Sequence, residues 1–98
     1  QAAAIKGAQV VYAKSWASIA RWGDAEAEKA ARKELRGWQV TGRAMETTAE
    51  GFFMHCLPVR RNVVVADEVL DGPACAVYDE AENRIWAQMA VLSAVVGR

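Results

Sequence analysis

A dense group of reactive and polar side chains follows an apolar segment in the middle of the chain, in "GFFMHCLPVRRN". His55 and Cys56 supply an imidazole and a thiol, and Pro58 fixes the backbone of the turn behind them. Arg60 and Arg61 can give planar, bidentate hydrogen bonds to a phosphate or a carboxylate. Because a strand that only fills a core usually ends in a solvated turn, this density of groups indicates a binding site.

Two familiar uses of these groups are disfavoured. His55 and Cys56 are neighbours in a predicted strand, so their side chains point to opposite faces and the imidazole cannot readily activate the thiol. A buried strand-end cysteine is the favoured interpretation of Cys56. Cys75 lies far along the chain, and nothing has the spacing of a zinc site. A site for an anion and an amino acid fits the residues best.

Three more side chains are expected near this site. Lys14 lies inside an otherwise apolar segment, "QVVYAKSW", where it gives a point charge for a carboxylate. Arg84 falls near the start of a predicted helix, where its charge opposes the helix dipole, and this placement favours a ligand. Trp16 is expected beside the ligand. For Arg60 and Arg61, the alternative of solvated or salt-bridged loop residues stays open.

Alternating strands and helices must position these groups. Apolar, β-branched runs predict three strands, over 9–16, 51–57 and 75–79. A helix is predicted over 25–37 after an Asp24 cap, and two shorter ones over 42–49 and within 66–73. A last helix is predicted from a capping box at Asp79 and Glu82 to Val96. Continuous apolar strands predict an α/β fold, part of a doubly wound, Rossmann-like parallel sheet of three strands with flanking helices. Ligands bind beyond the carboxyl ends of such strands, where Lys14, His55 and Arg84 fall.

Composition narrows the class of protein. The 98 residues allow one domain, and a formal net charge of zero gives no electrostatic attraction to nucleic acid or to an anionic membrane. Two cysteines are too few for a disulfide framework, which suggests a reducing compartment and a cytoplasmic location. The chain opens on Gln1, and "QAAAIKGA" is typical of a helix that ends at Gly7. We therefore expect a fragment of a longer protein.

Four segments with characteristic spacing carry a resemblance to a known family. "FMHCLP", "VRRN", "DEVLDGP" and "DEAENR", from about Ala8 onward, resemble the carboxy-terminal domain of the ornithine-type carbamoyltransferases. "YAKSW" and "LPVRRN" are similar to the N-acetylornithine and N-succinylornithine branch, with Lys14 where the ornithine enzymes carry an aspartate, and the "SMG" of those enzymes is missing. The resemblance implies that residues 1–98 are a partial domain, the carboxy-terminal amino-acid-binding half, without the amino-terminal carbamoyl-phosphate domain.

The resemblance also implies a reaction, the transfer of a carbamoyl group from carbamoyl phosphate to the δ-amine of an N-acylated ornithine in arginine biosynthesis. It places Cys56 and Leu57 against the carbamoyl group, Arg84 on carbamoyl phosphate, and Lys14 and Leu57 on the N-acylornithine. No cofactor or metal is implied, and the family forms homo-oligomers, trimers at full length. The fragment alone is expected to be inactive, because the family's Ser-Thr-Arg-Thr phosphate loop would lie upstream.

Alternatives remain at this point. An ornithine carbamoyltransferase, or a stand-alone module that binds a small anion or amino acid without catalysis, would also account for the motifs. Some N-acetylornithine enzymes carry a lysine at the position of Val64, which leaves the choice between acetyl and succinyl substrates open.

Overall fold

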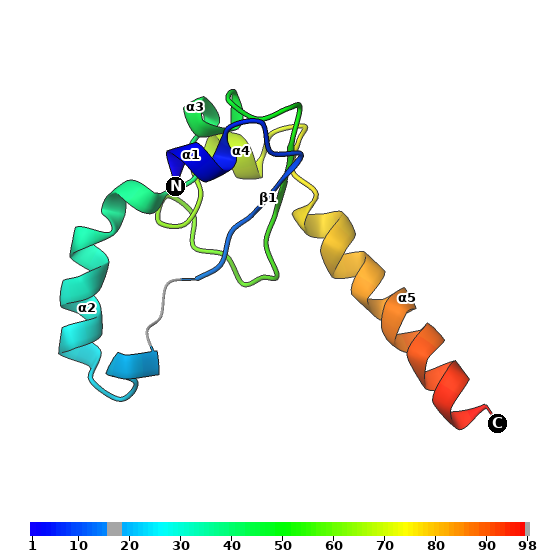
Figure 1. The fold of residues 1–98 in the computed structure, drawn as a ribbon. Coiled ribbons are helices and arrows are strands. Elements are labelled where there is room, and N and C mark those ends of the chain that lie inside the picture. The colour runs from blue at the N-terminus through cyan, green and yellow to red at the C-terminus, as the bar shows by residue number, and fades with distance from the viewer. Residues whose placement is uncertain (16–18, 98) are drawn as a thin grey trace.

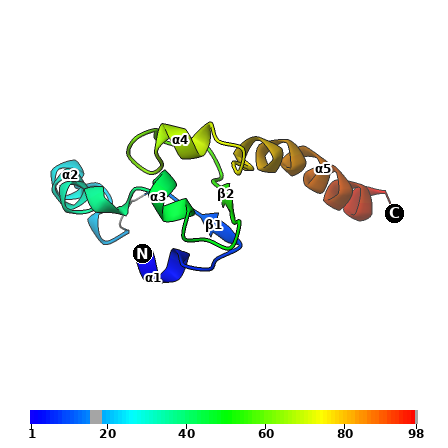
Figure 2. The ribbon, with the colours of Figure 1, turned by 90° about the horizontal axis from the view of Figure 1, so that it is seen from above.

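The computed structural model describes residues 1–15 and 19–97. The elements in chain order are α1 (Ala2–Ile5), β1 (Val10–Tyr12), the 3-10 helix η1 (Ile19–Arg21), α2 (Ala25–Glu34), the 3-10 helix η2 (Arg36–Trp38), α3 (Gly42–Met45), β2 (Phe52–Met54), α4 (Asp67–Leu70) and α5 (Val77–Val96). A central body holds the two strands with α1, α3 and α4, and the longer helices α2 and α5 extend from it in different directions (Figure 1). The view from above shows the same arrangement (Figure 2).

The centre of the molecule is a parallel pair of strands. β1 and β2 pair in the register Val10 with Phe52, Val11 with Phe53 and Tyr12 with Met54. The α/β class with a parallel sheet and flanking helices is therefore confirmed. Each strand is shorter than predicted, so that Lys14 lies just beyond the end of β1 and His55 just beyond β2.

The predicted third strand over 75–79 was wrong. On the other edge of β2, Phe53 makes a single parallel bridge with Cys75. Its N–H donates to the carbonyl of Ala74 at 2.8 Å, and its carbonyl accepts from Ala76 at 2.9 Å. Helix α5 then begins at Val77, which is completely buried. A short apolar run fits the buried first turn of a helix as well as it fits a strand, and here the helix prevails.

The helix starts were predicted with mixed success. The Asp24 cap of α2 is confirmed, because its side chain accepts from the N–H of Ala27 at 3.0 Å. The capping box at Asp79 and Glu82 was wrong, since α5 begins after Ala76 without a side-chain cap. Asp79 instead lies in the first turn of α5, where a carboxylate interacts favourably with the helix dipole.

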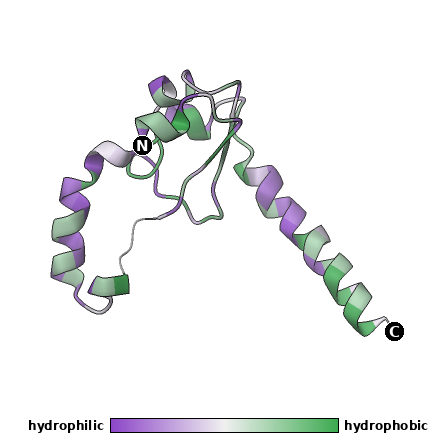
Figure 3. Cartoon of the chain, viewed as in Figure 1, coloured by the Kyte–Doolittle hydropathy of each residue, from purple (hydrophilic) through white to green (hydrophobic). Residues whose placement is uncertain are grey.

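The hydrophobic core is small and lies between the strands and the short helices. Its buried members are Ile5, Val11, Val40, Phe53, Val65, Val69, Leu70 and Val77. The two long helices contribute little to it, because α2 buries none of its residues and α5 buries only Val77. The carboxyl-terminal half of α5 is strongly apolar and exposed (Figure 3). Within the described residues, no helix is long and apolar enough to cross a membrane.

The two adjacent phenylalanines of β2 offer a matched test of this core. Phe53 is fully buried, whereas its neighbour Phe52 is 54% exposed. We expect Phe53→Ala to lower the free energy of unfolding by roughly 3–5 kcal/mol, because the missing side chain leaves a cavity in the hydrophobic core. Phe52→Ala should cost much less. Urea denaturation of the two variants measures the difference, and equal losses would contradict the assignment of Phe53 to the centre of the core.

Candidate active site

The segment that leaves β2 forms a tight turn over residues 55–58, called here the 55–58 turn. The N–H of His55 donates to Glu80 Oε2 at 3.1 Å, and the N–H of Leu57 donates to His55 Nδ1 at 3.0 Å. Leu57 has a φ of 42°, in the left-handed region that costs a residue with a side chain roughly 1–2 kcal/mol. These bonds hold the backbone on both sides of Cys56. Cys56 itself is exposed, so its interpretation as a buried cysteine was wrong.

The imidazole of His55 is enclosed by the protein, with only 1% of the residue exposed. Burial lowers the pKa of His55 because the imidazolium form would lose its hydration, and the nearby Glu80 carboxylate opposes that shift. Since Nδ1 accepts from Leu57, the neutral ring carries its proton on Nε2. No described residue accepts a hydrogen bond from Nε2. His55 thus acts on the turn through Nδ1.

Glu80, in the first turn of α5, connects this turn to β1. Its Oε1 accepts from the hydroxyl of Tyr12 at 2.7 Å, while its Oε2 holds the N–H of His55. The bond to Glu80 is the main cause of a raised pKa of Tyr12, and the neighbouring Cys56 thiol acts in the same direction. The Tyr12 hydroxyl therefore keeps its proton and remains a donor at neutral pH. One carboxylate thus joins the ends of both strands to the start of α5.

The 55–58 turn and α5 together line a pocket of about 640 Å³, called here the turn pocket. Its lining residues are His55, Cys56, Leu57, Pro58, Glu80, Ala81, Arg84, Ile85 and Gln88. The structure thus brings Arg84 to the turn, as the sequence predicts. The dipole argument for Arg84 was wrong, however, because α5 begins at Val77 and Arg84 lies beyond the first turn, where the dipole effect has faded. The Arg84 side chain is exposed and can reach a ligand in the pocket.

Lys14 lines a different pocket, of about 380 Å³, called here the Lys14 pocket. Its other lining residues are Gln1, Ala4, Ile5, Ala8, Val10, Val11, Tyr12, Ala13, Trp38, Val40 and Val64. Lys14 is exposed and lies past the end of β1, so the prediction that it sits inside a strand was wrong. The pocket is mainly apolar, and of the described residues that line it only Lys14 has a charged side chain. Tyr12 connects the two pockets, since the residue lines this one and its hydroxyl bonds to Glu80 in the other.

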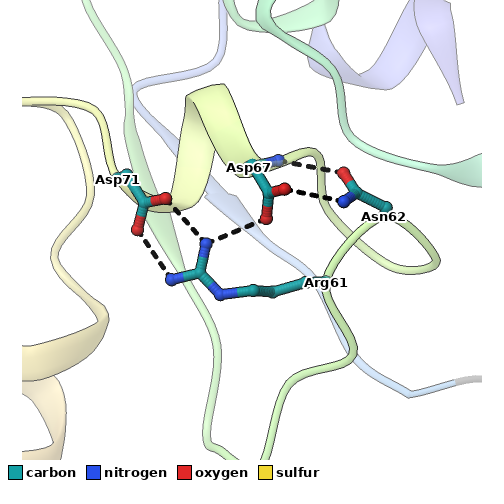
Figure 4. A network of polar contacts seen from close by, with 4 residues as sticks. All are labelled: Arg61, Asn62, Asp67 and Asp71. Carbon is teal, nitrogen blue, oxygen red and sulfur yellow. Dashed lines mark hydrogen bonds and ion pairs between the residues drawn. The ribbon is translucent and has the colours of Figure 1, made fainter.

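Arg61, which follows the 55–58 turn, forms ion pairs with two aspartates. Arg61 Nη2 contacts Asp71 Oδ1 at 2.7 Å, and its Nη1 contacts Asp71 Oδ2 at 2.7 Å and Asp67 Oδ1 at 2.9 Å (Figure 4). Asn62 Nδ2 donates to the second oxygen of Asp67 at 2.7 Å. The Arg61 guanidinium holds the pKa of both aspartates below its usual range. Of the two interpretations of Arg61, the structure therefore favours the salt-bridged loop residue.

The remaining predicted accessory residues are Arg60 and Trp16. Arg60 is exposed and lines neither of them. Trp16 lies outside the described residues. In the described ranges, no cluster of three or more His, Cys, Asp or Glu side chains is placed to hold a metal ion.

Comparison with known proteins identifies the family. The family model described as "Aspartate/ornithine carbamoyltransferase, Asp/Orn binding domain" matches residues 1–95. The chain belongs to the aspartate/ornithine carbamoyltransferase family. It is 47% identical over 95 residues to the N-acetylornithine carbamoyltransferase of Xanthomonas campestris pv. campestris, and 50% identical over 94 residues to the ornithine carbamoyltransferase of Symbiobacterium thermophilum. These alignments cover 97% and 95% of this chain but 28% and 29% of the relatives, so the carbamoyltransferase chain described here spans under a third of their length.

Solved carbamoyltransferases share the arrangement of the chain. A crystal structure of N-acetyl-L-ornithine transcarbamylase superposes with a TM-score of 0.88 at 46% identity, covering 95% of this chain and 28% of that one. A structure of acetylornithine transcarbamylase complexed with acetylcitrulline gives a TM-score of 0.87 at the same identity and coverage. The two-stranded sheet with its flanking helices therefore matches part of the carbamoyltransferase fold.

Two residues of the candidate site were missed from the sequence. Tyr12 was counted only as an apolar strand residue, and Glu80 only as part of "DEAENR". Glu80 precedes Arg84 by four positions, and residues at this spacing share one face of a helix. Once Arg84 is placed at the site, the same face brings Glu80 with it, so the signal was present in the helix periodicity.

The buried imidazole predicts how acid affects stability. His55 is the single histidine of the chain, and its pKa in the folded protein lies below the ordinary 6.5. As the pH falls below 6.5, the unfolded chain therefore binds a proton at His55 before the native state does, and stability is lost as the pH falls further through the native pKa. We expect the free energy of unfolding to fall between about pH 7 and pH 5 in the parent and to change less in His55→Gln. Urea denaturation across this range measures the effect, and parallel curves for the two proteins would contradict it.

Proposed function

We propose that this chain is the amino-acid-binding part of a longer carbamoyltransferase, and that the enzyme transfers a carbamoyl group from carbamoyl phosphate to the δ-amine of an N-acylated ornithine. This would be a step of arginine biosynthesis. The relatives named as N-acetylornithine carbamoyltransferases, and the solved transcarbamylase complexed with acetylcitrulline, support this assignment. The two free cysteines are consistent with a cytoplasmic enzyme.

The single observation that carries the proposal is the charge of the Lys14 pocket. Free ornithine has an α-ammonium, which a cation would repel. Acylation removes that charge and leaves a carboxylate, for which an exposed ammonium beyond β1 is a suitable partner. Among the described residues, none of the other lining side chains is charged, so none of them offsets Lys14. The apolar remainder of the lining suits the uncharged part of an acylated substrate.

The turn pocket supplies the other half of the proposed reaction. The δ-amine attacks the carbamoyl carbon, the bond from that carbon to the phosphate oxygen breaks, and the amine loses a proton. Arg84 would neutralise charge on the phosphate, and the backbone of Cys56 and Leu57 would hold the carbamoyl group. Catalysis in this scheme rests on positioning and on electrostatic stabilisation of the developing charge, without a covalent intermediate on the protein.

An ornithine carbamoyltransferase is the second candidate. The relative of that name from Symbiobacterium thermophilum is 50% identical, slightly more than the N-acetylornithine enzyme named above. Overall identity therefore does not separate the two substrates, and the proposal depends on Lys14. A homo-oligomer, trimeric at full length, is part of the same proposal.

Substitution of Lys14 tests the assignment. In the full-length enzyme, Lys14→Ala should weaken N-acylornithine binding about tenfold or more, because one charge-assisted bond is lost, typically worth roughly 1.5–3 kcal/mol. Carbamoyl phosphate binding should change little. Lys6→Ala removes an equivalent exposed charge outside both pockets and is the matched control. Titration calorimetry with each ligand separates the two affinities, and equal losses for both ligands would refute the role of Lys14.

A further inference from the structure

A chain of three side chains runs from the Lys14 pocket to the 55–58 turn. Tyr12 lines the Lys14 pocket, and its hydroxyl donates to Glu80 Oε1 at 2.7 Å. Glu80 Oε2 accepts from the N–H of His55 at 3.1 Å, and His55 Nδ1 accepts from the N–H of Leu57 at 3.0 Å. These residues are called here the Tyr12–Glu80–His55 relay. Every link is a hydrogen bond of ordinary length, and together they reach from one pocket to the other.

The relay ends on the most strained residue of the turn. Leu57 has a φ of 42°, a conformation that a residue with a side chain adopts only when its surroundings enforce it. The hydrogen bond from the Leu57 N–H to His55 Nδ1 helps to hold Leu57 in this conformation. His55 is in turn held by its own N–H on Glu80 and by almost complete burial. The orientation of the Cys56 and Leu57 backbone therefore depends on where the Glu80 carboxylate lies.

Tyr12 fixes one end of that carboxylate. Two oxygens of Glu80 receive two donors from different elements, so the carboxylate plane is set by β1 as well as by the turn. The Tyr12 phenol is protonated at neutral pH and can donate, and its raised pKa extends this donor role to more alkaline pH. We propose that Tyr12 and Glu80 are positioning residues, which hold the 55–58 turn in the geometry that binds carbamoyl phosphate. The catalytic part of this statement rests on the proposed function.

The relay differs from the contacts that stabilise the fold. Tyr12 is 51% exposed, and it is not a member of the buried core around Phe53. Removing its hydroxyl leaves the aromatic ring and the backbone pairing of β1 with β2 unchanged. Loss of the hydroxyl should therefore affect the turn without unfolding the protein. Tyr78 offers a matched control, because it is 64% exposed on α5 and lines neither pocket.

The first measurement follows the turn itself, in the full-length protein and without substrate. Hydrogen–deuterium exchange of a peptide that spans residues 52–60 reports the N–H groups of His55 and Leu57. Glu80→Ala removes both acceptor oxygens and should speed this exchange roughly tenfold, and Tyr12→Phe should speed it roughly threefold. Tyr78→Phe should leave it unchanged. Unchanged exchange in both Glu80→Ala and Tyr12→Phe would overturn the relay.

The second measurement is steady-state kinetics with both substrates. Tyr12→Phe should raise the KM for carbamoyl phosphate roughly threefold, as expected for one lost hydrogen bond, while the KM for N-acylornithine stays within about twofold. A general loss of folding would instead lower kcat with both KM values unchanged, and that result would overturn the positioning role. If the parent protein shows no carbamoyl transfer, the proposed function fails, and the exchange experiment alone still decides whether the relay holds the turn.

Discussion

Phe53 occupies the position on which the rest of the structure depends. Its side chain is fully buried, and its backbone is paired on both sides, with Val11 of β1 on one side and with residues 74–76 on the other. This double pairing brings the end of β1 and the start of α5 to opposite flanks of β2. The hydrogen bond between Tyr12 and Glu80 depends on this pairing, because the backbones of both elements are held next to Phe53. The site is therefore a consequence of how the core is paired.

The second consequence concerns the charges at the site. Glu80 is a negative group beside a turn that is proposed to bind carbamoyl phosphate, and its charge would be unfavourable if it faced that anion. In the structure both of its oxygens are occupied by protein donors, Tyr12 and His55, so the carboxylate organises the turn. The cations with access to the two pockets are different ones, Arg84 in the turn pocket and Lys14 in its own. The carboxylate of Glu80 therefore positions the turn, while the proposed ligand-binding charges are those of Arg84 and Lys14.

Much of this arrangement could be predicted from the sequence, and the failures have physical causes. The two parallel strands were predicted correctly in kind from their apolar, β-branched residues, although each strand buries only one face: Val11 and Phe53 are buried, whereas Val10 and Phe52 are about half exposed. The strand prediction over 75–79 was wrong, since Val77 is the buried first residue of a helix, and a buried apolar residue is equally typical of a strand. Apolar residues recur along one face of α5, at Ala81, Ile85, Met89, Leu92 and Val96, yet Ile85 and Met89 are more than half exposed here. Periodicity identifies a face that can pack and says nothing about what covers it. Tyr12 was missed because a hydrogen bond between residues far apart in sequence has no local signature, whereas Glu80 could have been found from its spacing of four positions to Arg84 on the same helix.

The central claim is that an exposed lysine in an otherwise uncharged pocket selects an acylated amino acid. The most direct test is a comparison of kcat/KM for N-acetylornithine, N-succinylornithine and free ornithine with the purified full-length enzyme at saturating carbamoyl phosphate. The account predicts that at least one acylated substrate exceeds ornithine by about tenfold or more, the factor expected from one charge-assisted contact. A clear preference for free ornithine over both acylated substrates would contradict it.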